Sequence, residues 1–165
     1  MKLIVGIGNP GLEYLDTWHN AGIVAIKKLK GLQDKGKFPK NVVLKESDEF
    51  MNNSGEFVLN LVKKYNINPQ DLFVIHDDLD IKLGRGPKIQ FGKGPKDHNG
   101  LKSIDEALGS NQYWHVRVGV DNRPMDNRVM GEEYVLQSYN KEEKEMLNKT
   151  IEKIAKELLK KFKSQ

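Results

Sequence analysis

The sequence has no cysteine among its 165 residues. A chain without cysteine has no disulfide framework, no thiolate nucleophile and no thiolate-ligated metal site. It also has no apolar run that approaches the length of about 18 residues needed to span a membrane. The apolar stretch after Lys2 is three residues long, which is too short for a secretory signal. These absences lead us to expect a soluble, cytoplasmic protein without a membrane partner.

The excess of positive over negative charge is small. Lys and Arg together number 27 and Asp and Glu 23, which gives a formal net charge of +4 and a sequence pI near 9.1. A basic chain attracts polyanions such as nucleic acid. Many lysines, however, lie at Lys27, Lys28 and Lys30 and in the last predicted helix, where a solvated helix face explains them equally well. Composition therefore leaves nucleic-acid binding and a simple charged surface both open.

Short apolar runs alternate along the chain with stretches of helical periodicity. Continuous runs at 3–5 and 72–75 are typical of buried strands, 41–45 reads as a further short strand, and the alternation over 114–120 predicts a half-buried one. The remaining predicted elements are helices over 21–29, 53–65, 98–108 and 142–162, a loop over 31–40, a turn over 82–86 and a candidate strand at 87–91.

This order of elements predicts the fold class. A chain of 165 residues buries one core, so we expect a single domain over 1–165. Strands that alternate with helices predict an α/β protein, in which a mostly parallel or mixed twisted sheet is flanked by helices on both faces. Asn20 and Asn53 precede predicted helices and are expected to cap them, Asn53 together with Glu56.

Two familiar kinds of ligand site are disfavoured. The turn from Gly6 to Gly11 matches the G-x-G-x-x-G pattern, but Pro10 and a further loop separate it from the next helix, so a dinucleotide site is not expected. The run from His76 to Asp80 offers metal-ligating groups, yet the four histidines are scattered and consecutive acids are more often a turn. We expect neither cofactor nor metal and keep a metal-dependent hydrolase as an alternative.

The groups suited to catalysis lie at three strand-to-loop corners. His19 follows the first corner with Asn9, Asn52 follows the second strand, and Asp77 and Asn99 belong to the third corner. A histidine paired with an aspartate makes a general base, and asparagine amides hold carbonyls or position water. With no thiol and no Gly-x-Ser-x-Gly turn, direct attack by water is favoured over a covalent intermediate. The other histidines, His76 and His115 among them, are more simply read as structural.

Several stretches together resemble one enzyme family, the bacterial-type peptidyl-tRNA hydrolases. They occur in family order over roughly the first three quarters of the chain, and their combination is specific although each is weak alone. The stretches are Lys2 to Gly6, Asn9-Pro10-Gly11, Glu13-Tyr14, His19-Asn20, Phe50-Met51-Asn52, Ser54-Gly55, His76 to Asp80, His98 to Lys102 and Arg117-Val118-Gly119.

The resemblance implies a monomeric cytoplasmic hydrolase without metal or cofactor. It would cleave the ester between a peptide and the 3′ end of tRNA, and so recycle tRNA from stalled or prematurely released peptidyl-tRNA. His19 would be the general base and Asp77 would hold its imidazolium. Asn9 and Asn52 would hold the peptide and the reacting carbonyl, with Asn52 also a candidate oxyanion donor, and Asn99 would position the water or the RNA end.

The resemblance also implies residues that bind the substrate. Tyr14 and Met51 would line the same cleft. A basic clamp on the phosphates of the acceptor stem would be formed by Arg117 with Lys88, Lys93 and Lys96. Such contacts do not depend on the nucleotide sequence and weaken as the salt concentration rises. A non-catalytic RNA-binding module, in which these basic residues matter and the histidine is incidental, stays as the second alternative.

The chain departs from the family pattern at four places. Trp18 stands where the family usually has arginine, so a cation is missing beside His19. The approach to His98 is Lys93-Gly94-Pro95-Lys96-Asp97 in place of a glycine-rich segment. The stretch between the first helix and Phe50 is shorter than usual, and Asn53 stands where leucine is usual. None of these changes removes the proposed base, its aspartate or the three main asparagines.

Overall fold

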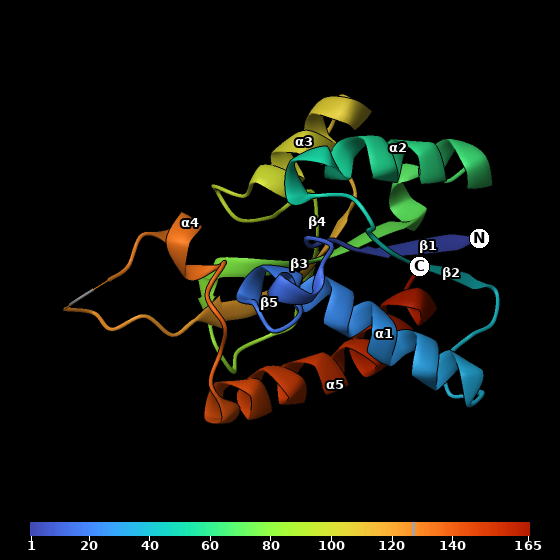
Figure 1. The fold of residues 1–165 in the computed structure, drawn as a ribbon. Helices are drawn as coiled ribbons and strands as arrows, with labels where there is room; N and C mark the ends of the chain where they lie inside the picture. The colour runs from blue at the N-terminus through green and yellow to red at the C-terminus, as the bar shows by residue number, and fades with distance from the viewer. Residues whose placement is uncertain (127) are drawn as a thin grey trace.

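The computed structural model describes residues 1–126 and 128–165, which form one layered α/β body (Figure 1). Its central five-stranded sheet has the order β2-β1-β3-β5-β4. Neighbouring strands are parallel except β4, which runs antiparallel to β5 at one edge. The mixed sheet predicted from the sequence is confirmed. The strands are β1 (Lys2–Gly6), β2 (Val42–Glu46), β3 (Leu72–Lys82), β4 (Lys88–Phe91) and β5 (Trp114–Asp121).

Helices cover both faces of the sheet, as predicted: α2 and α3 lie on one face, and α1 and α5 on the other (Figure 1). The alternation of side chains along each strand explains the two cores. Val5 and Val74 pack with α2 and α3, whereas Ile4 and Phe73 pack with α1 and α5. The α-helices are α1 (Ala21–Asp34), α2 (Ser54–Tyr65), α3 (Asn99–Leu108), α4 (Gly131–Tyr134) and α5 (Lys141–Lys163), and the short 3-10 turns are η1 (Leu12–Tyr14), η2 (Trp18–Asn20), η3 (Met51–Asn53) and η4 (Pro69–Asp71).

Helix α1 begins in direct backbone contact with the sheet. A Cβ built on Gly22 would lie 2.3 Å from the carbonyl oxygen of Ile75 in β3 and 2.8 Å from that of Ile7. No other residue fits this position without moving the helix. The turn η2, which carries His19, ends where α1 begins, so this contact fixes the turn at the carboxyl ends of β1 and β3.

Helix α1 is longer than the sequence pattern predicts. It continues past Leu29 to Asp34, where a loop was expected from Gly31 onward. The prediction gave weight to Gly31 as a helix breaker. In the structure that glycine faces open space, with nothing within 4 Å of a Cβ built on it, so its weak helix propensity costs only about 1 kcal/mol.

Strand β3 is also longer than predicted. It was expected to end at Ile75 and to be followed by a turn, but it runs on to Lys82. The extension is held by parallel pairing with β5, in which His76 lies opposite Arg117 and Asp77 opposite Val118. The polar residues after Ile75 are therefore strand residues with fixed directions rather than members of a mobile turn.

Both faces of β5 are buried, which corrects the prediction of a half-buried strand. His115 and Arg117, the polar residues of the alternation, are only 2% and 6% exposed. The segment after β4 covers this face, because a Cβ on Gly94 would lie 2.8 Å from Nδ1 of His115. The side chain of Gln90 in β4 adds to the cover by accepting a hydrogen bond from Arg117.

The predicted side-chain caps at Asn20 and Asn53 are wrong. Both residues stand at helix starts, but neither side chain bonds to the first turn. Asn20 instead pairs with the backbone of Asn9. Among the described residues, His98 caps α3 by accepting the N–H of Leu101, and α5 starts with a capping box at Asn140.

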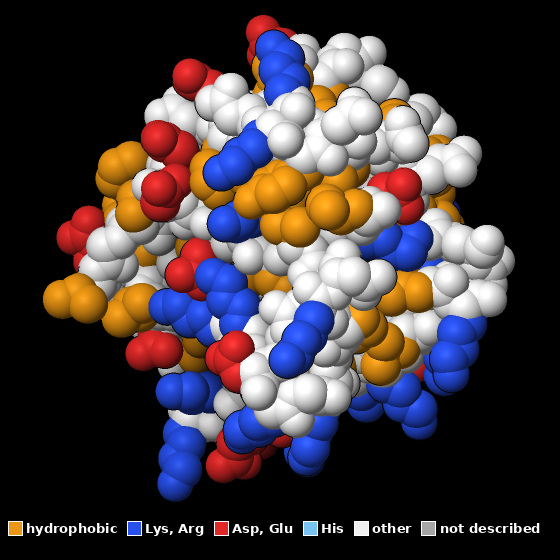
Figure 2. Space-filling view, turned by 90° about the vertical axis from the view of Figure 1, so that its right-hand side faces the viewer, with side chains coloured by type: hydrophobic (Ala, Val, Ile, Leu, Met, Phe, Trp, Pro, Cys, Tyr) orange, Lys and Arg blue, Asp and Glu red, His pale blue; other side chains and the backbone are white. Residues whose placement is uncertain are grey.

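On one face of the molecule the charged side chains are distributed rather than gathered into one stripe (Figure 2). Figure 2 views the face near the two chain termini, where Lys and Arg side chains are interleaved with acidic, apolar and uncharged ones. Lys27 and Lys28, on the outer side of α1, are exposed. The two lysines of α1 thus fit the interpretation that they belong to a solvated helix face. No helix in the described part of the chain is long and apolar enough to cross a membrane.

Candidate active site

A cleft of about 650 Å³ opens at the carboxyl end of β1 and along the second half of β3, beyond its pairing with β1. Parallel sheets place ligand sites at this edge because the loops that follow neighbouring strands meet there. The cleft brings together eight residues singled out from the sequence, which come from four separate stretches of chain (9–19, 51–52, 77 and 96–99). These residues are Asn9, Tyr14, His19, Met51, Asn52, Asp77, Lys96 and Asn99.

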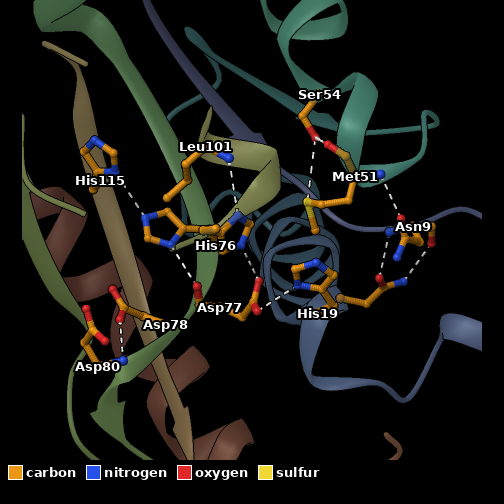
Figure 3. Close-up of polar contacts among 12 residues, drawn as sticks. Asn9, His19, Met51, Ser54, His76, Asp77, Asp78, Asp80, Leu101 and His115 are labelled. Atoms are coloured by element: carbon orange, nitrogen blue, oxygen red, sulfur yellow. Dashed lines mark hydrogen bonds and ion pairs between the residues drawn. The ribbon is translucent and has the colours of Figure 1, made fainter. Parts of the chain in front are cut away.

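His19 and Asp77 form a hydrogen-bonded pair at the floor of the cleft (Figure 3). Nδ1 of His19 lies 2.8 Å from Oδ2 of Asp77. Burial alone would raise the pKa of the Asp77 carboxyl. The charges of His19 and His98 and the hydrogen bonds to them outweigh burial, so this pKa lies far below its usual value. An ionised carboxylate only accepts, so Nδ1 of His19 carries the proton and Nε2 is left as the basic atom.

The surroundings of His19 stabilise its protonated form more than water would. Burial by itself would lower the pKa of His19, but the charge of Asp77 and the hydrogen bond to it outweigh burial and raise that pKa above its ordinary value. A histidine whose protonated form is stabilised in this way can take a proton from water and hold it, which is the property of a general base.

The second oxygen of Asp77 is held by His98, a residue that the sequence placed at the start of a helix and at the same corner as Asp77, but without a role of its own. Nε2 of His98 lies 2.8 Å from Oδ1 of Asp77. Nδ1 of His98 accepts the N–H of Leu101 at 3.3 Å, so the proton is on Nε2 and is donated to the carboxylate. One neutral histidine therefore caps α3 and orients Asp77. The one sequence signal is a histidine in the N-cap position, which does not reveal the contact with Asp77.

Asn9 is fixed by three hydrogen bonds. Its backbone N–H donates to Oδ1 of Asn20 at 2.8 Å, and its carbonyl accepts from Nδ2 of Asn20 at 2.9 Å. Its side-chain Oδ1 accepts the N–H of Met51 at 2.8 Å. Because Oδ1 is occupied, Nδ2 of Asn9 is the group available to donate into the cleft. Asn52 and Asn99 present exposed amides along the same cleft.

The remaining two histidines, His76 and His115, contact each other outside the cleft lining, and His76 also contacts the backbone of Asp77. Nε2 of His76 lies 3.3 Å from Nδ1 of His115, and Nδ1 of His76 donates to the carbonyl of Asp77. Burial lowers the pKa of His76 well below its usual value and that of His115 to about 4, so both are neutral near pH 7. Neither lines the cleft, in keeping with the structural role expected for them.

Arg117 does not reach the cleft. Its Nε donates to Oδ2 of Asp78 at 2.7 Å and its Nη1 to Oε1 of Gln90 at 2.7 Å, and the residue is buried. A guanidinium held in this way is part of the sheet, so we do not carry forward the prediction that it clamps phosphates. Lys88 and Lys93 are exposed but lie outside the cleft lining, whereas Lys96 is in it.

The described residues contain one group of side chains with the composition of a metal site: His19, Asp77 and His98, whose ligand atoms lie within 4.8 Å of one another. The protonation pattern argues against metal binding there. A metal on Nε2 of His98 would move the ring proton to Nδ1, where it would face the N–H of Leu101 and break the helix cap. The alternative cluster from His76 to Asp80 is divided, because His76 contacts His115 and Asp78 pairs with Arg117.

Trp18, the unusual neighbour of His19, is a core residue with 1% exposure. Its ring stacks on Tyr134 at 5.5 Å and contacts Tyr139 at 5.0 Å. Beside it, the N–H of His19 donates to the carbonyl of Val135 at 2.8 Å. The segment that contains α4 thus holds the His19 turn from the side away from Asp77.

The same segment supplies a cleft wall that the sequence reading did not predict. Arg123, Met130 and Leu136 line it together with Val135. These residues belong to no motif, and the stretch has no clear periodicity. Tertiary contacts with the His19 turn, among them the stack of Trp18 on Tyr134 and the bond of His19 to Val135, bring this wall to the site.

The chain is similar to known peptidyl-tRNA hydrolases in sequence and in fold. A family model described as peptidyl-tRNA hydrolase matches residues 3–165. The peptidyl-tRNA hydrolases of Rickettsia conorii (strain ATCC VR-613 / Malish 7) and Rickettsia felis (strain ATCC VR-1525 / URRWXCal2) are both 40% identical to the chain, over 93% and 94% of its length and 89% and 90% of their own. The crystal structure of peptidyl-tRNA hydrolase from Acinetobacter baumannii is similar with a TM-score of 0.77 at 29% identity, over 92% of this chain and 83% of that one. The resemblance found in the sequence is confirmed, and the chain belongs to the peptidyl-tRNA hydrolase family.

Proposed function

We propose that this member of the family cleaves the ester between a peptide and the 3′ end of tRNA with His19 as the general base. The observation that carries the proposal is the bond of Nδ1 of His19 to the buried, ionised Asp77, which leaves Nε2 basic at the cleft floor. In this mechanism Nε2 takes a proton from water as the water oxygen attacks the ester carbonyl. The imidazolium, stabilised by Asp77, returns that proton to the departing ribose oxygen.

The asparagines hold the reacting groups. Nδ2 of Asn9 is the donor best placed for the substrate carbonyl, because its Oδ1 is occupied by the N–H of Met51. Asn52 follows Met51 in the chain and offers a second hydrogen-bond donor to the negative charge that develops on the carbonyl oxygen. Asn99, at the first turn of α3, positions the water or the RNA end, and Tyr14 contacts the peptide.

The nucleic-acid side of the proposal rests on charge. Lys96 borders the cleft, and the exposed Lys88 and Lys93 are on the same stretch of chain. We assign to them sequence-independent contacts with the acceptor stem. The enzyme, residues 1–165 as one domain, would work as a cytoplasmic monomer that recycles tRNA from prematurely released peptidyl-tRNA, without cofactor or metal.

The decisive variant is His19→Ala. Loss of the general base should lower the rate of hydrolysis of N-acetylaminoacyl-tRNA by a factor of about 10² to 10⁴, and RNA binding measured by filter retention should hardly change. His115→Gln is the matched control, because it removes a buried histidine that does not touch the cleft. Undiminished activity of the His19 variant would exclude this mechanism.

The same assay separates the alternatives that the sequence left open. Wild-type protein is incubated with N-acetylaminoacyl-tRNA in the presence of EDTA. Release of the acetylated amino acid at an unchanged rate argues against a metal-dependent hydrolase and against a non-catalytic RNA-binding module. Binding without release would favour the module, and release abolished by EDTA and restored by a divalent cation would favour the metal enzyme.

A further inference from the structure

Arg123 is a cation built into the cleft wall that the segment after β5 supplies. It lies just beyond the end of β5, lines the cleft, and its side chain is only 13% exposed. Its Nε donates to Oδ1 of Asp121 at 2.8 Å, and its Nη1 donates to the carbonyl of Val129 at 3.1 Å. These bonds use Nε and Nη1 and hold the guanidinium in one orientation.

The positive charge of Arg123 is not cancelled by its partner. Asp121 also accepts a hydrogen bond from Arg128, so one carboxylate is shared by two guanidinium groups. The pair of arginines with Asp121 carries a net charge of +1. Because Asp121 is only 13% exposed, solvent screens this charge less than it screens a surface lysine.

An aromatic stack connects Arg123 with the turn that carries the general base. The guanidinium carbon lies 5.5 Å from the centre of the Tyr134 ring. The same ring stacks on Trp18, the residue before His19. The hydroxyl of Tyr134 donates to the carbonyl of Val120 at 2.7 Å, which ties the stack to the end of β5. The cation therefore has a fixed place relative to His19.

We propose that Arg123 binds the phosphodiester group nearest to the scissile ester, and so places the terminal ribose over His19. This inference rests on the function proposed above. Next to the ester, the peptide offers neutral amides, whereas the first charged group on the RNA side is a phosphodiester. An arginine is always charged and its N–H fork matches two phosphate oxygens, so phosphate is the ligand that best fits a fixed guanidinium.

The test compares two esters that differ in their phosphates: N-acetylaminoacyl-tRNA, and N-acetylaminoacyl-adenosine, which has no phosphate. The Arg123→Gln variant should lose about 10-fold or more in kcat/KM on the tRNA ester, mainly through KM, and keep the wild-type kcat/KM on the adenosine ester. Its binding to tRNA should also depend less on salt, with a slope smaller by about one ion. Arg123→Lys should recover part of the salt dependence.

Lys153→Gln is the matched control, because it removes one positive charge from the exposed side of α5 and does not line the cleft. It should leave both esters and the salt slope close to wild type. An equal loss of Arg123→Gln on both esters would assign Arg123 to support of the loop, and no loss on the tRNA ester would also overturn the proposal. Failure of the general-base mechanism gives a separate result, full activity of His19→Ala on both esters.

Discussion

At the scale of single residues, the site depends on how Asp77 is shared. Its two oxygens bond to two imidazoles, His19 and His98, each at 2.8 Å. The donation from His98 withdraws part of the negative charge that acts on His19. Asp77 and His19 were predicted from the sequence because a histidine and an aspartate at neighbouring corners suit a general base. His98 was not, because nothing in sequence distinguishes a capping histidine from one that also holds a carboxylate.

The role of His98 predicts a change in pH dependence. In His98→Phe the full charge of Asp77 acts on His19, so the pKa of His19 rises further. Because the general base must be neutral, the acidic limb of the kcat/KM profile moves to higher pH, and activity on that limb falls by about 10-fold for a shift of one unit. Lys102→Ala, an exposed change in the same helix α3, should leave the limb in place. An unmoved limb in the His98 variant would mean that His98 only caps α3.

At the scale of elements, the sequence predicted which strands and helices exist but not where several of them end. The apolar run of β3 stops at Ile75, whereas the strand continues because Asp77 and its neighbours pair with β5. The end of α1 was misplaced because Gly31 was read as a break, although it lies on an open side of the helix. Both errors arise from tertiary contacts, or from their absence, which local periodicity does not encode.

The contact of α1 with the sheet predicts opposite effects of two glycine substitutions in one helix. Gly22→Ala would place a methyl group 2.3 Å from the carbonyl of Ile75, so α1 must shift. We expect a loss of about 1–3 kcal/mol in the free energy of unfolding, and a lower kcat because His19 lies three residues before the contact. Gly31→Ala meets nothing and should raise stability by about 0.5–1 kcal/mol with unchanged kcat. Urea denaturation and steady-state kinetics on both variants test this, and equal stabilities would contradict the backbone contact.

At the scale of the whole molecule, the parallel sheet made the main part of the site predictable. Loops that follow neighbouring parallel strands meet at one edge, so Asn9, Asn52 and Asp77 were expected to converge before any contact was known. The wall around Arg123 could not be predicted in this way. It comes from the segment after the last parallel strand, and it reaches the cleft through packing of Tyr134 on Trp18. The helix lysines, by contrast, give the chain its basic charge without lining the cleft.

The histidines predict how the stability of the whole fold changes with pH. His76 and His115 are buried and neutral, with a pKa well below the usual value for His76 and about 4 for His115. In the unfolded chain both titrate near about 6.5. Below that pH the unfolded state binds protons that the folded state does not, so the free energy of unfolding should fall as the pH is lowered from 6.5 towards 4. His19, whose pKa is raised, acts in the opposite sense, and Asp77 contributes to the loss only at pH values below about 4.

The size and source of this effect are open to measurement. For His115 alone the loss should approach about 3 kcal/mol at pH 4, from a pKa difference of about 2.5 units. Urea denaturation of the wild type and of His115→Phe at several pH values between 7 and 4.5 measures it. The variant cannot bind that proton on unfolding, so its stability should decline less steeply than that of the wild type. Parallel curves would show that His115 is already protonated in the folded protein, and a wild-type curve that does not fall below pH 6.5 would show that neither buried histidine stays neutral in the fold.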